Sequence, residues 1–181
     1  MRWTKLKQRI EDGFADTAKG RIEVWSTRYR KSHDQEGEGW ITIDKERFHS
    51  MGSLAYLAEL YERSTLLQKE RNCSDFYDSA KYEAYRATLT EVEEDLENEG
   101  TIPLEYFHAA LFGYLNSSIE QILCSDQTIV RALGMFDKRL GKRRLKKMDV
   151  SGERELVQNF FRIRCAFENI SPIQTLELPN L

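Results

Sequence analysis

Cysteine, histidine and proline are scarce in this chain, and none of them is clustered. The 181 residues contain three of each. Cys73, Cys124 and Cys165 are odd in number and form no C-x-x-C pair, which argues against a zinc ribbon, a thioredoxin-type site and a disulfide framework. We therefore expect free, mostly packed thiols. The scattered histidines show no metal-ligand spacing either, so the sequence predicts no metal site and no cofactor.

Long apolar runs and the common nucleotide or hydrolase motifs are also missing. No segment approaches the roughly 20 apolar residues of a membrane span, and the opening MRWTKLKQRIEDGF lacks a signal-peptide core. The phosphate-loop, dinucleotide, G-x-S-x-G and kinase signatures are absent. We therefore predict a soluble cytoplasmic protein that does not associate with membranes, and an enzyme is not the leading interpretation.

Charge is abundant but nearly balanced. Charged residues make up 31% of the chain, the formal net charge is −3, and the apolar fraction of 40% is typical of a folded domain. A near-neutral chain has no global field, so attraction to nucleic acid would have to come from a local patch. At this length we predict a single domain over residues 1–181. Its parts are a helix with a hairpin or sheet (1–52), a helical part (53–170) and an irregular tail (171–181).

Residues that favour β-strands are confined to the N-terminal third. A helix is predicted over residues 3–14 from its apolar spacing, followed by strands at 21–29 and 40–43. Residues 45–51 are a candidate third strand, because a two-stranded hairpin is marginal without a neighbour. The expected fold class is therefore α+β, with a small N-terminal antiparallel hairpin or three-stranded sheet packed with about five to six helices.

The remainder has the three-and-four spacing of amphipathic helices. Capping residues and glycines delimit predicted helices at 54–72, 79–98, 104–115, 126–140 and 156–167, with a short turn at 119–123. The end of the second of these helices is acidic. Negative charge there opposes the helix dipole, and a basic neighbour would offset it. The acidic residues are Glu91, Glu93, Glu94, Asp95, Glu97 and Glu99.

The sharpest local feature is the segment DKRLGKRRLKK, in which seven cations fall within ten positions. We call residues 138–147 the basic cluster. Such a cluster neutralises phosphates, and it would give salt-dependent binding to nucleic acid or to an acidic protein surface. Structural roles are the leading interpretation, because cations near a helix C-terminus offset its dipole and residues 142–147 can pair with the acidic segment 91–99. Its cations are Lys138, Arg139, Lys142, Arg143, Arg144, Lys146 and Lys147.

The loop of the predicted hairpin offers a second candidate site. Arginines and aromatic rings on a sheet stack bases or anchor a partner, and a histidine beside an aspartate acts as an acid or base. Solvated loop residues and core aromatics are the more ordinary interpretation. Trp25 and Trp40 are expected nearby, whereas His108 is expected as a hydrogen-bonded core residue. The loop residues are Arg28, Tyr29, Arg30, His33 and Asp34.

Three segments carry a resemblance that spans most of the chain. They are RWTKLKQRIEDGFAD, GRIEVWSTRYRKSHDQEGEGWITID and SDQTIVRALGMFDKRLGKRRL. Together they resemble a family of small uncharacterised bacterial proteins without assigned function, labelled by a founding locus tag. The resemblance implies a bacterial, soluble, cytoplasmic protein. It assigns no catalytic or binding role to any position.

Separated acidic and basic segments without a reaction motif favour a non-enzymatic protein that binds another macromolecule, as a regulator or an immunity-type inhibitor. The expected partner is another protein. One alternative is a nucleic-acid-binding protein that uses the basic cluster with Arg28 and Arg30. Another is an enzyme whose site is assembled by tertiary contacts from His33 or His108 and distant carboxylates.

Overall fold

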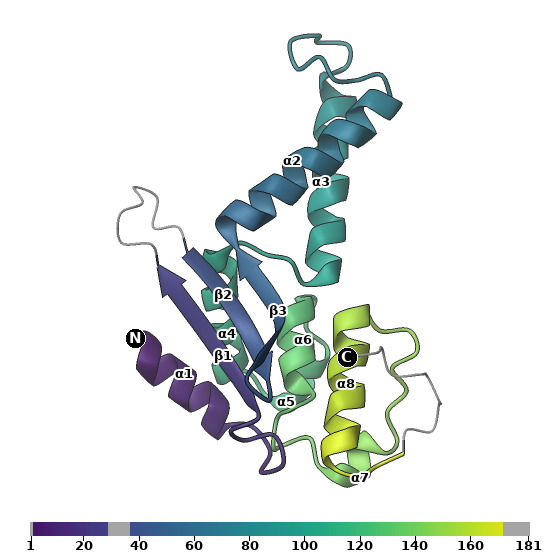
Figure 1. Cartoon of the computed structure of the whole chain (residues 1–181). Helices are drawn as coiled ribbons and strands as arrows, with labels where there is room; N and C mark the ends of the chain where they lie inside the picture. The colour runs from purple at the N-terminus through teal and green to yellow at the C-terminus, as the bar shows by residue number, and fades with distance from the viewer. Residues whose placement is uncertain (1, 29–36, 172–181) are drawn as a thin grey trace.

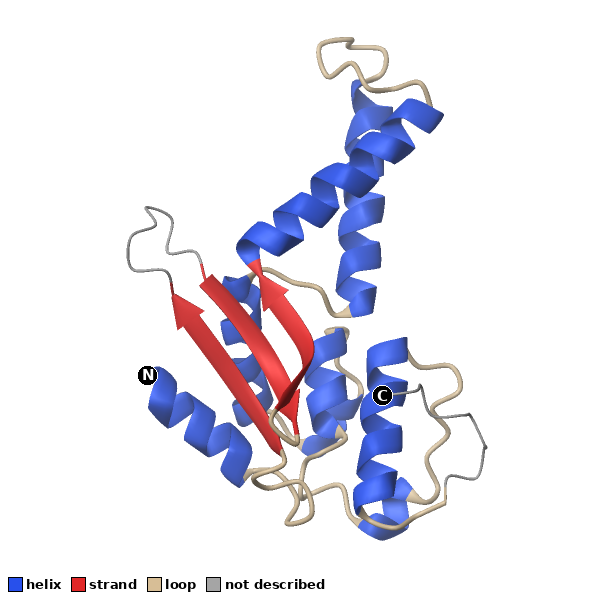
Figure 2. Cartoon of the chain, viewed as in Figure 1, coloured by secondary structure: helices blue, strands red, loops and turns tan. Residues whose placement is uncertain are grey.

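The computed structural model describes residues 2–28 and 37–171 (Figure 1). Its sheet lies in front of α4, with α1 along one edge and α6 and α8 beyond the other (Figures 1 and 2). The predicted α+β class is confirmed. The elements are α1 (Trp3–Asp12), β1 (Ile22–Arg28), β2 (Gly37–Ile43), β3 (Glu46–Gly52), α2 (Ser53–Glu70), α3 (Tyr82–Glu99), α4 (Leu104–Asn116), α5 (Ile119–Leu123), α6 (Thr128–Gly134), α7 (Lys142–Leu145) and α8 (Glu155–Phe167). The eight helices of the described residues slightly exceed the expected number, since α5 and α7 have only five and four residues.

The three strands form one antiparallel sheet in the order β1-β2-β3, so the predicted third strand is confirmed. Alternate residues turn one face toward the helices, and Ile22, Val24 and Ile41 are fully buried there. β2 begins at Gly37, three residues before the predicted start. Gly39 lies in this extension. The position requires glycine, because a Cβ there would lie 2.5 Å from the Phe107 ring of α4.

Helix α1 covers the outer edge of β1. The backbone N–H of Val24 donates to the Glu11 carboxylate at 2.9 Å, and the Lys7 ammonium donates to the Val24 carbonyl at 3.1 Å. An exposed strand edge is a template for pairing with other chains. These two side chains therefore occupy backbone groups that an incoming strand would otherwise use.

The main core lies between the sheet and the helices α4, α6 and α8. Phe107 and Leu111 of α4 are fully buried, and the Phe136 and Phe160 rings meet at a centroid distance of 5.0 Å. Aromatic pairs at this separation contribute beyond their buried area. α4 contacts α1, α6, β2 and β3, and five of its residues are buried, so it is the central helix of this core.

The predicted helix over residues 126–140 is wrong in its second half, since α6 ends at Gly134. The reason is the carboxylate of Asp137, which is buried and accepts hydrogen bonds from the Tyr114 hydroxyl and the Arg139 guanidinium, each at 2.7 Å. Burial raises the pKa of Asp137, but these hydrogen bonds outweigh it and hold the pKa below its ordinary value. The chain therefore turns after α6, and Gly141 precedes α7 as its N-cap instead of closing a longer helix.

Helices α2 and α3 pair side by side and stand out from the rest of the molecule (Figure 1). We call residues 53–100 the arm and the other described residues the body. The arm has a small core of its own, in which Leu60, Val92 and Leu96 are buried. α3 ends at Gly100, which has a φ of +85°. The loop that follows returns the chain to the body at α4.

Substitution of Gly100 by alanine is expected to lower the free energy of unfolding by about 2 kcal/mol. The left-handed conformation costs an L-residue roughly 1–2 kcal/mol. In addition, the new Cβ would lie 2.6 Å from the Leu156 Cδ2 atom of α8. Urea unfolding followed by far-UV circular dichroism measures the change.

Gly113→Ala is the matched control for this substitution. Gly113 is an exposed residue of α4, and a methyl group added at its Cα would have no neighbouring atom within 4 Å. Alanine in a helix interior is favoured over glycine by roughly 0.5–1 kcal/mol, so this variant should be as stable as the wild type or more stable. Equal losses in both variants would contradict the role assigned to Gly100.

Candidate functional site

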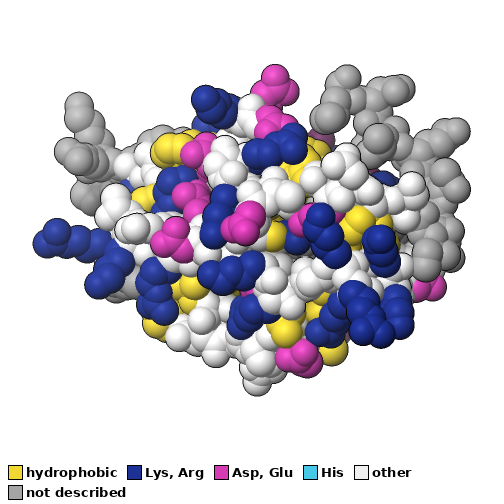
Figure 3. Space-filling model, turned by 90° about the horizontal axis from the view of Figure 1, so that it is seen from below, with side chains coloured by type: hydrophobic (Ala, Val, Ile, Leu, Met, Phe, Trp, Pro, Cys, Tyr) yellow, Lys and Arg dark blue, Asp and Glu magenta, His cyan; other side chains and the backbone are white. Residues whose placement is uncertain are grey.

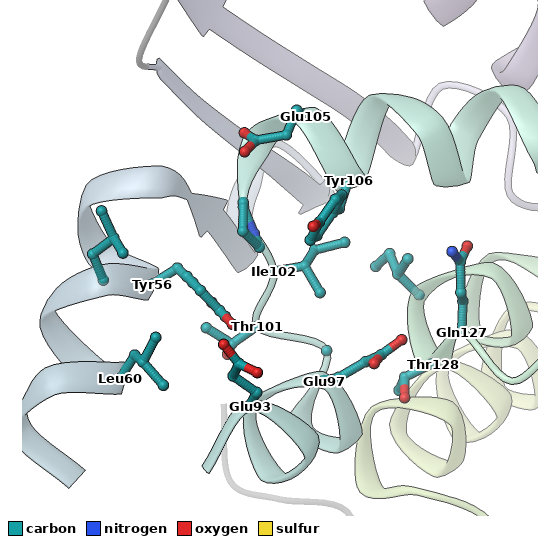
Figure 4. A pocket seen from close by; sticks show the side chains of 14 residues that line it. Tyr56, Leu60, Glu93, Glu97, Thr101, Ile102, Glu105, Tyr106, Gln127 and Thr128 are labelled. Carbon is teal, nitrogen blue, oxygen red and sulfur yellow. The ribbon is translucent and has the colours of Figure 1, made fainter. Parts of the chain in front are cut away.

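A cleft of about 470 Å³ lies where the arm meets the body, and we call it the junction cleft. Four helices and one loop build it from segments far apart in the sequence (Figure 4). Its lining residues are Tyr56, Leu57 and Leu60 of α2, Glu93 and Glu97 of α3, Gly100, Thr101, Ile102 and Pro103 of the loop, Glu105 and Tyr106 of α4, and Gln127, Thr128 and Ile129 of α6. A concave surface of this size is the usual form of a binding site.

The lining of the junction cleft combines apolar and aromatic groups. Leu60, Ile102 and Ile129 are buried, so their side chains form an apolar floor. Tyr106 is 60% exposed, and Tyr56 extends from α2 toward Glu93 (Figure 4). An apolar floor with aromatic walls can hold the stem of a long side chain.

The charge in the junction cleft has one sign. Glu93 and Glu97 lie one turn apart on α3, and Glu105 lines the cleft from α4, whereas no lysine or arginine is among the lining residues. Burial raises the pKa of Tyr56, and the negative charges of Glu93 and Glu97 raise it further. Ser53 donates a hydrogen bond to Glu105 at 3.1 Å. The cleft is therefore suited to a cationic group or a hydrogen-bond donor.

Apolar side chains continue from the junction cleft along the arm. Leu57 lines the cleft, and Leu54 and Tyr61 lie one turn away on either side of it along α2. All three are exposed by 40% or more. At the far end of the arm, the Phe76 ring lies edge-on to Tyr77, which is 92% exposed. Leu54, Leu57 and Tyr61 therefore lie outside the buried face of α2, which corrects the amphipathic pattern expected for residues 54–72.

One family is similar to this chain over almost its whole length. The model of the SF0329 protein family matches residues 2–165. The chain belongs to the SF0329 protein family. The match confirms the resemblance drawn from the three sequence segments, while the bacterial origin stays a prediction. No curated protein and no solved structure matches the chain.

In this member of the SF0329 family, most of the basic cluster is engaged within the molecule. The Lys138 ammonium donates to the Asp12 carbonyl at the end of α1, at 3.0 Å. Arg139 binds the Asp137 carboxylate. Because α6 ends at Gly134, Lys138 and Arg139 do not lie in the last turn of a helix as expected. Lys142 pairs with Glu168 at 2.7 Å, and Arg144 pairs with Glu120 at 3.0 Å. The expected pairing with the acidic segment 91–99 is therefore wrong.

Three members of the basic cluster have a different environment. Arg143, Lys146 and Lys147 are exposed, and none of them forms an ion pair with another of the described residues. Lysines and arginines gather on this underside of the molecule, with acidic side chains among them (Figure 3). The cluster thus divides into structural cations and a smaller exposed group.

The hairpin loop candidates are only partly described. Tyr29, Arg30, His33 and Asp34 lie outside the described residues. Arg28 ends β1 and lines a second hollow, of about 770 Å³. Trp25 and Trp40 pair directly across β1 and β2 with rings 6.2 Å apart, and the cations of Lys7 and Arg47 lie over them. The tryptophans therefore already contact cations of the same chain.

His108 lines the second hollow and is half-buried, so it is not a core residue, although its expected hydrogen bond is present. Its Nε2 atom lies 2.8 Å from the Ser26 hydroxyl oxygen. Burial lowers the pKa of His108, and the positive charge of Arg28 adds to this effect. A neutral imidazole can accept a proton from a serine, but no carboxylate among the described residues orients its other nitrogen. The arrangement is a hydrogen-bonded pair without the remainder of a hydrolytic site.

The described residues hold no group of three or more His, Cys, Asp or Glu side chains placed to bind a metal ion. Within the same ranges, no helix is both long and apolar enough to cross a bilayer. Cys73 and Cys165 are buried and Cys124 is exposed, and all three are free thiols, as predicted. Burial raises the pKa of the Cys165 thiol to about 11, which makes it unreactive.

Acidification from pH 7.5 to pH 5.5 is expected to lower the free energy of unfolding through His49. The His49 Nε2 atom lies 2.9 Å from the Gly100 carbonyl and so holds β3 to the loop that lines the junction cleft. Burial lowers the pKa of His49, with the hydrogen bond opposing the shift in part. Because an unfolded histidine titrates near pH 6.5, the unfolded state takes up more protons in this window, and stability falls as pH falls.

Urea titrations at pH 7.5, 6.5 and 5.5 measure this dependence. The buried carboxylates Asp137 and Glu168 have lowered pKa values, so the stability that they contribute is lost only at more acidic pH. His49→Asn should flatten the pH dependence, and His108→Asn should remove the separate contribution of the other lowered pKa. A pH dependence unchanged in both variants would show that neither histidine is responsible.

Proposed function

We propose that this protein is a non-enzymatic cytoplasmic protein that binds another protein through its arm, as a regulator or inhibitor. The observation that carries the proposal is the distribution of exposed apolar surface. Nine large hydrophobic side chains of the described residues are exposed, and six of them lie in the arm. They are Leu54, Leu57, Tyr61, Leu66, Phe76 and Tyr77. Apolar surface concentrated on one element is typical of an interaction site.

The charge distribution supports the same proposal. Residues 53–100 contain twelve Asp and Glu and five Lys and Arg, a net charge of −7, whereas the rest of the chain carries +4. A local excess of one sign steers a partner of opposite sign and orients it during encounter. The arm therefore favours a partner that presents basic residues.

The arm is also held in a defined shape. Arg63 pairs with Glu99 at 2.7 Å, and Arg71 pairs with Glu91 at 2.7 Å, so two ion pairs join α2 to α3. Exposed ion pairs contribute little to stability, typically about 0.2–1 kcal/mol. Together with the small core of the arm, they nevertheless reduce the freedom that docking would have to remove.

Photo-crosslinking in cells tests the proposal. A photoreactive phenylalanine analogue placed at Tyr61 or Tyr77 is expected to give a discrete protein adduct, while the same analogue at the exposed Gln121 of the body should give none. The combined variant Leu57→Ser/Tyr61→Ser should reduce the adduct at Tyr77 at least about tenfold, as loss of interface anchors does. Equal adducts at all three positions, or none on the arm, would contradict the proposal.

A nucleic-acid-binding function is the second candidate, and the exposed cations Arg143, Lys146 and Lys147 favour it. Phosphate contacts make affinity fall steeply as salt rises. Fluorescence anisotropy with labelled single- and double-stranded oligonucleotides at low and physiological salt measures this. Binding at low salt that the variant Arg143→Ala/Lys146→Ala/Lys147→Ala loses would support the candidate, and absence of binding at low salt would exclude it.

The control for that experiment removes the same charge from the arm, as Lys69→Ala/Lys81→Ala/Arg86→Ala. These three residues lie far along the arm from the basic cluster. Lys142 is not substituted, because its partner Glu168 is buried and would lose one of its ion pairs. Equal losses of affinity in the two triple variants would indicate an effect of net charge alone.

A further inference from the structure

We infer that the junction cleft receives a lysine or arginine side chain of the partner protein, presented by a segment that also carries apolar residues. This inference rests on the proposed function, because it names what the docked partner inserts beside the arm. The cleft opens between the arm and α4, and a partner seated on the exposed face of α2 would lie across its mouth.

Acidic residues of the same helix differ in whether they have a partner. Glu91 and Glu99 of α3 each bind an arginine of the arm, at 2.7 Å. Glu93 and Glu97, which face the cleft, form no ion pair with the described residues, and no cation lines the cleft. Within the described part of the chain, two acidic residues of α3 outside the cleft are therefore paired, whereas the two that face the cleft are not.

The space beside these carboxylates is lined by apolar and aromatic side chains. Lysine and arginine bury an aliphatic stem and keep the charged head near polar groups. Leu60, Ile102 and Ile129 supply an apolar floor for such a stem. The rings of Tyr56 and Tyr106 lie beside the same space, and aromatic faces attract cations. The negative charges of Glu93 and Glu97 act in this space. Burial is the main cause of the raised pKa of Tyr56, and these two charges raise that pKa further.

The apolar surface beside the cleft favours a protein as the source of the cation. Leu54, Leu57 and Tyr61 extend the apolar surface from the cleft along α2, further than a small amine would cover. The basic cluster of a second copy is a poorer match, because its exposed cations Arg143 and Lys146 lie in a segment without an exposed large hydrophobic residue.

Selection from a phage-displayed library of random peptides, each about 12 residues long, supplies the probe. Peptides that bind the wild-type protein are expected to share a lysine or arginine flanked by apolar residues. Their affinity should fall tenfold or more for Glu93→Gln/Glu97→Gln, and norleucine in place of the shared cation should reduce it similarly. Glu94→Gln/Asp95→Asn is the matched control, because it removes two charges from the exposed surface of α3 outside the cleft and should leave the affinity unchanged.

Several outcomes would overturn the inference. Selections that yield no binder, peptides without a shared cation, or equal losses in the two double variants would each do so. Displacement of the peptides by micromolar spermidine would assign the cleft to a small polyamine instead. A concentration-dependent dimer in analytical ultracentrifugation that Glu93→Gln/Glu97→Gln abolishes would assign it to a second copy of the chain.

Photo-crosslinking separates failure of the inference from failure of the proposed function. If the arm docks a protein and the cleft takes its cation, Glu93→Gln/Glu97→Gln should lower the Tyr61 adduct tenfold or more. An adduct that persists in this variant at wild-type yield would retain protein docking and refute the cleft as the cation site. Absence of an adduct in the wild-type protein would refute the proposed function itself.

Discussion

The position of the junction cleft depends on one buried carboxylate, that of Asp137. It accepts hydrogen bonds from the Tyr114 hydroxyl and from the backbone and guanidinium of Arg139, and so ties α4 to the segment after α6. Backbone hydrogen bonds from Ala15 to Phe136 and from Lys138 to Gly13 bring the end of α1 to the same place. Because α4 and α6 each line the cleft, this carboxylate joins the two helices that supply two of its walls. The buried Tyr114 hydroxyl would bear a desolvation cost if it lost this partner.

Charge has different roles in the two parts of the molecule. In the body, the buried Glu168 carboxylate pairs with Arg164 and Lys142 and accepts a hydrogen bond from the Thr17 hydroxyl, each at 2.7 Å. Lys142, which resembles part of a binding patch in the sequence, therefore has a structural contact within the fold. A buried ion pair contributes little net stability, but breaking it leaves an uncompensated charge. In the arm, by contrast, the acidic excess is neutralised only in part. Among the described residues, unpaired charge of one sign is therefore found in the arm more than in the basic cluster.

The sequence predicted the elements better than their contacts. The spacing of apolar residues located all three strands and most helices. Burial of one face directly requires an apolar residue at every second position of a strand and at every third or fourth position of a helix. The end of α6 was missed because Tyr114 and Asp137 are 23 residues apart and only the fold brings them together. The same reason hid the partners of Lys142 and Arg144, which are the distant residues Glu168 and Glu120. Tertiary contacts override local propensity at such positions.

The junction cleft was not predicted either, because four separate helices line it. A signal was nevertheless present in the sequence of α2, where Leu54, Leu57 and Tyr61 lie beside, and not within, the face buried against α3. In the proposed function, these exposed apolar residues of α2 and the acidic residues Glu93 and Glu97 of α3 together form the surface that the partner contacts.

The exposed leucines of the arm contribute little to its folding, because Leu54 and Leu66 remain more than half exposed in the folded chain. Exposed apolar surface also favours nonspecific association, which a net charge away from zero opposes. The acidic excess of the arm therefore has two compatible effects. It keeps the apolar surface from associating with further copies of the equally acidic arm, and it leaves that surface available to a partner of opposite charge. Both effects act on the same element, so the proposed function would depend on the same charge that opposes self-association.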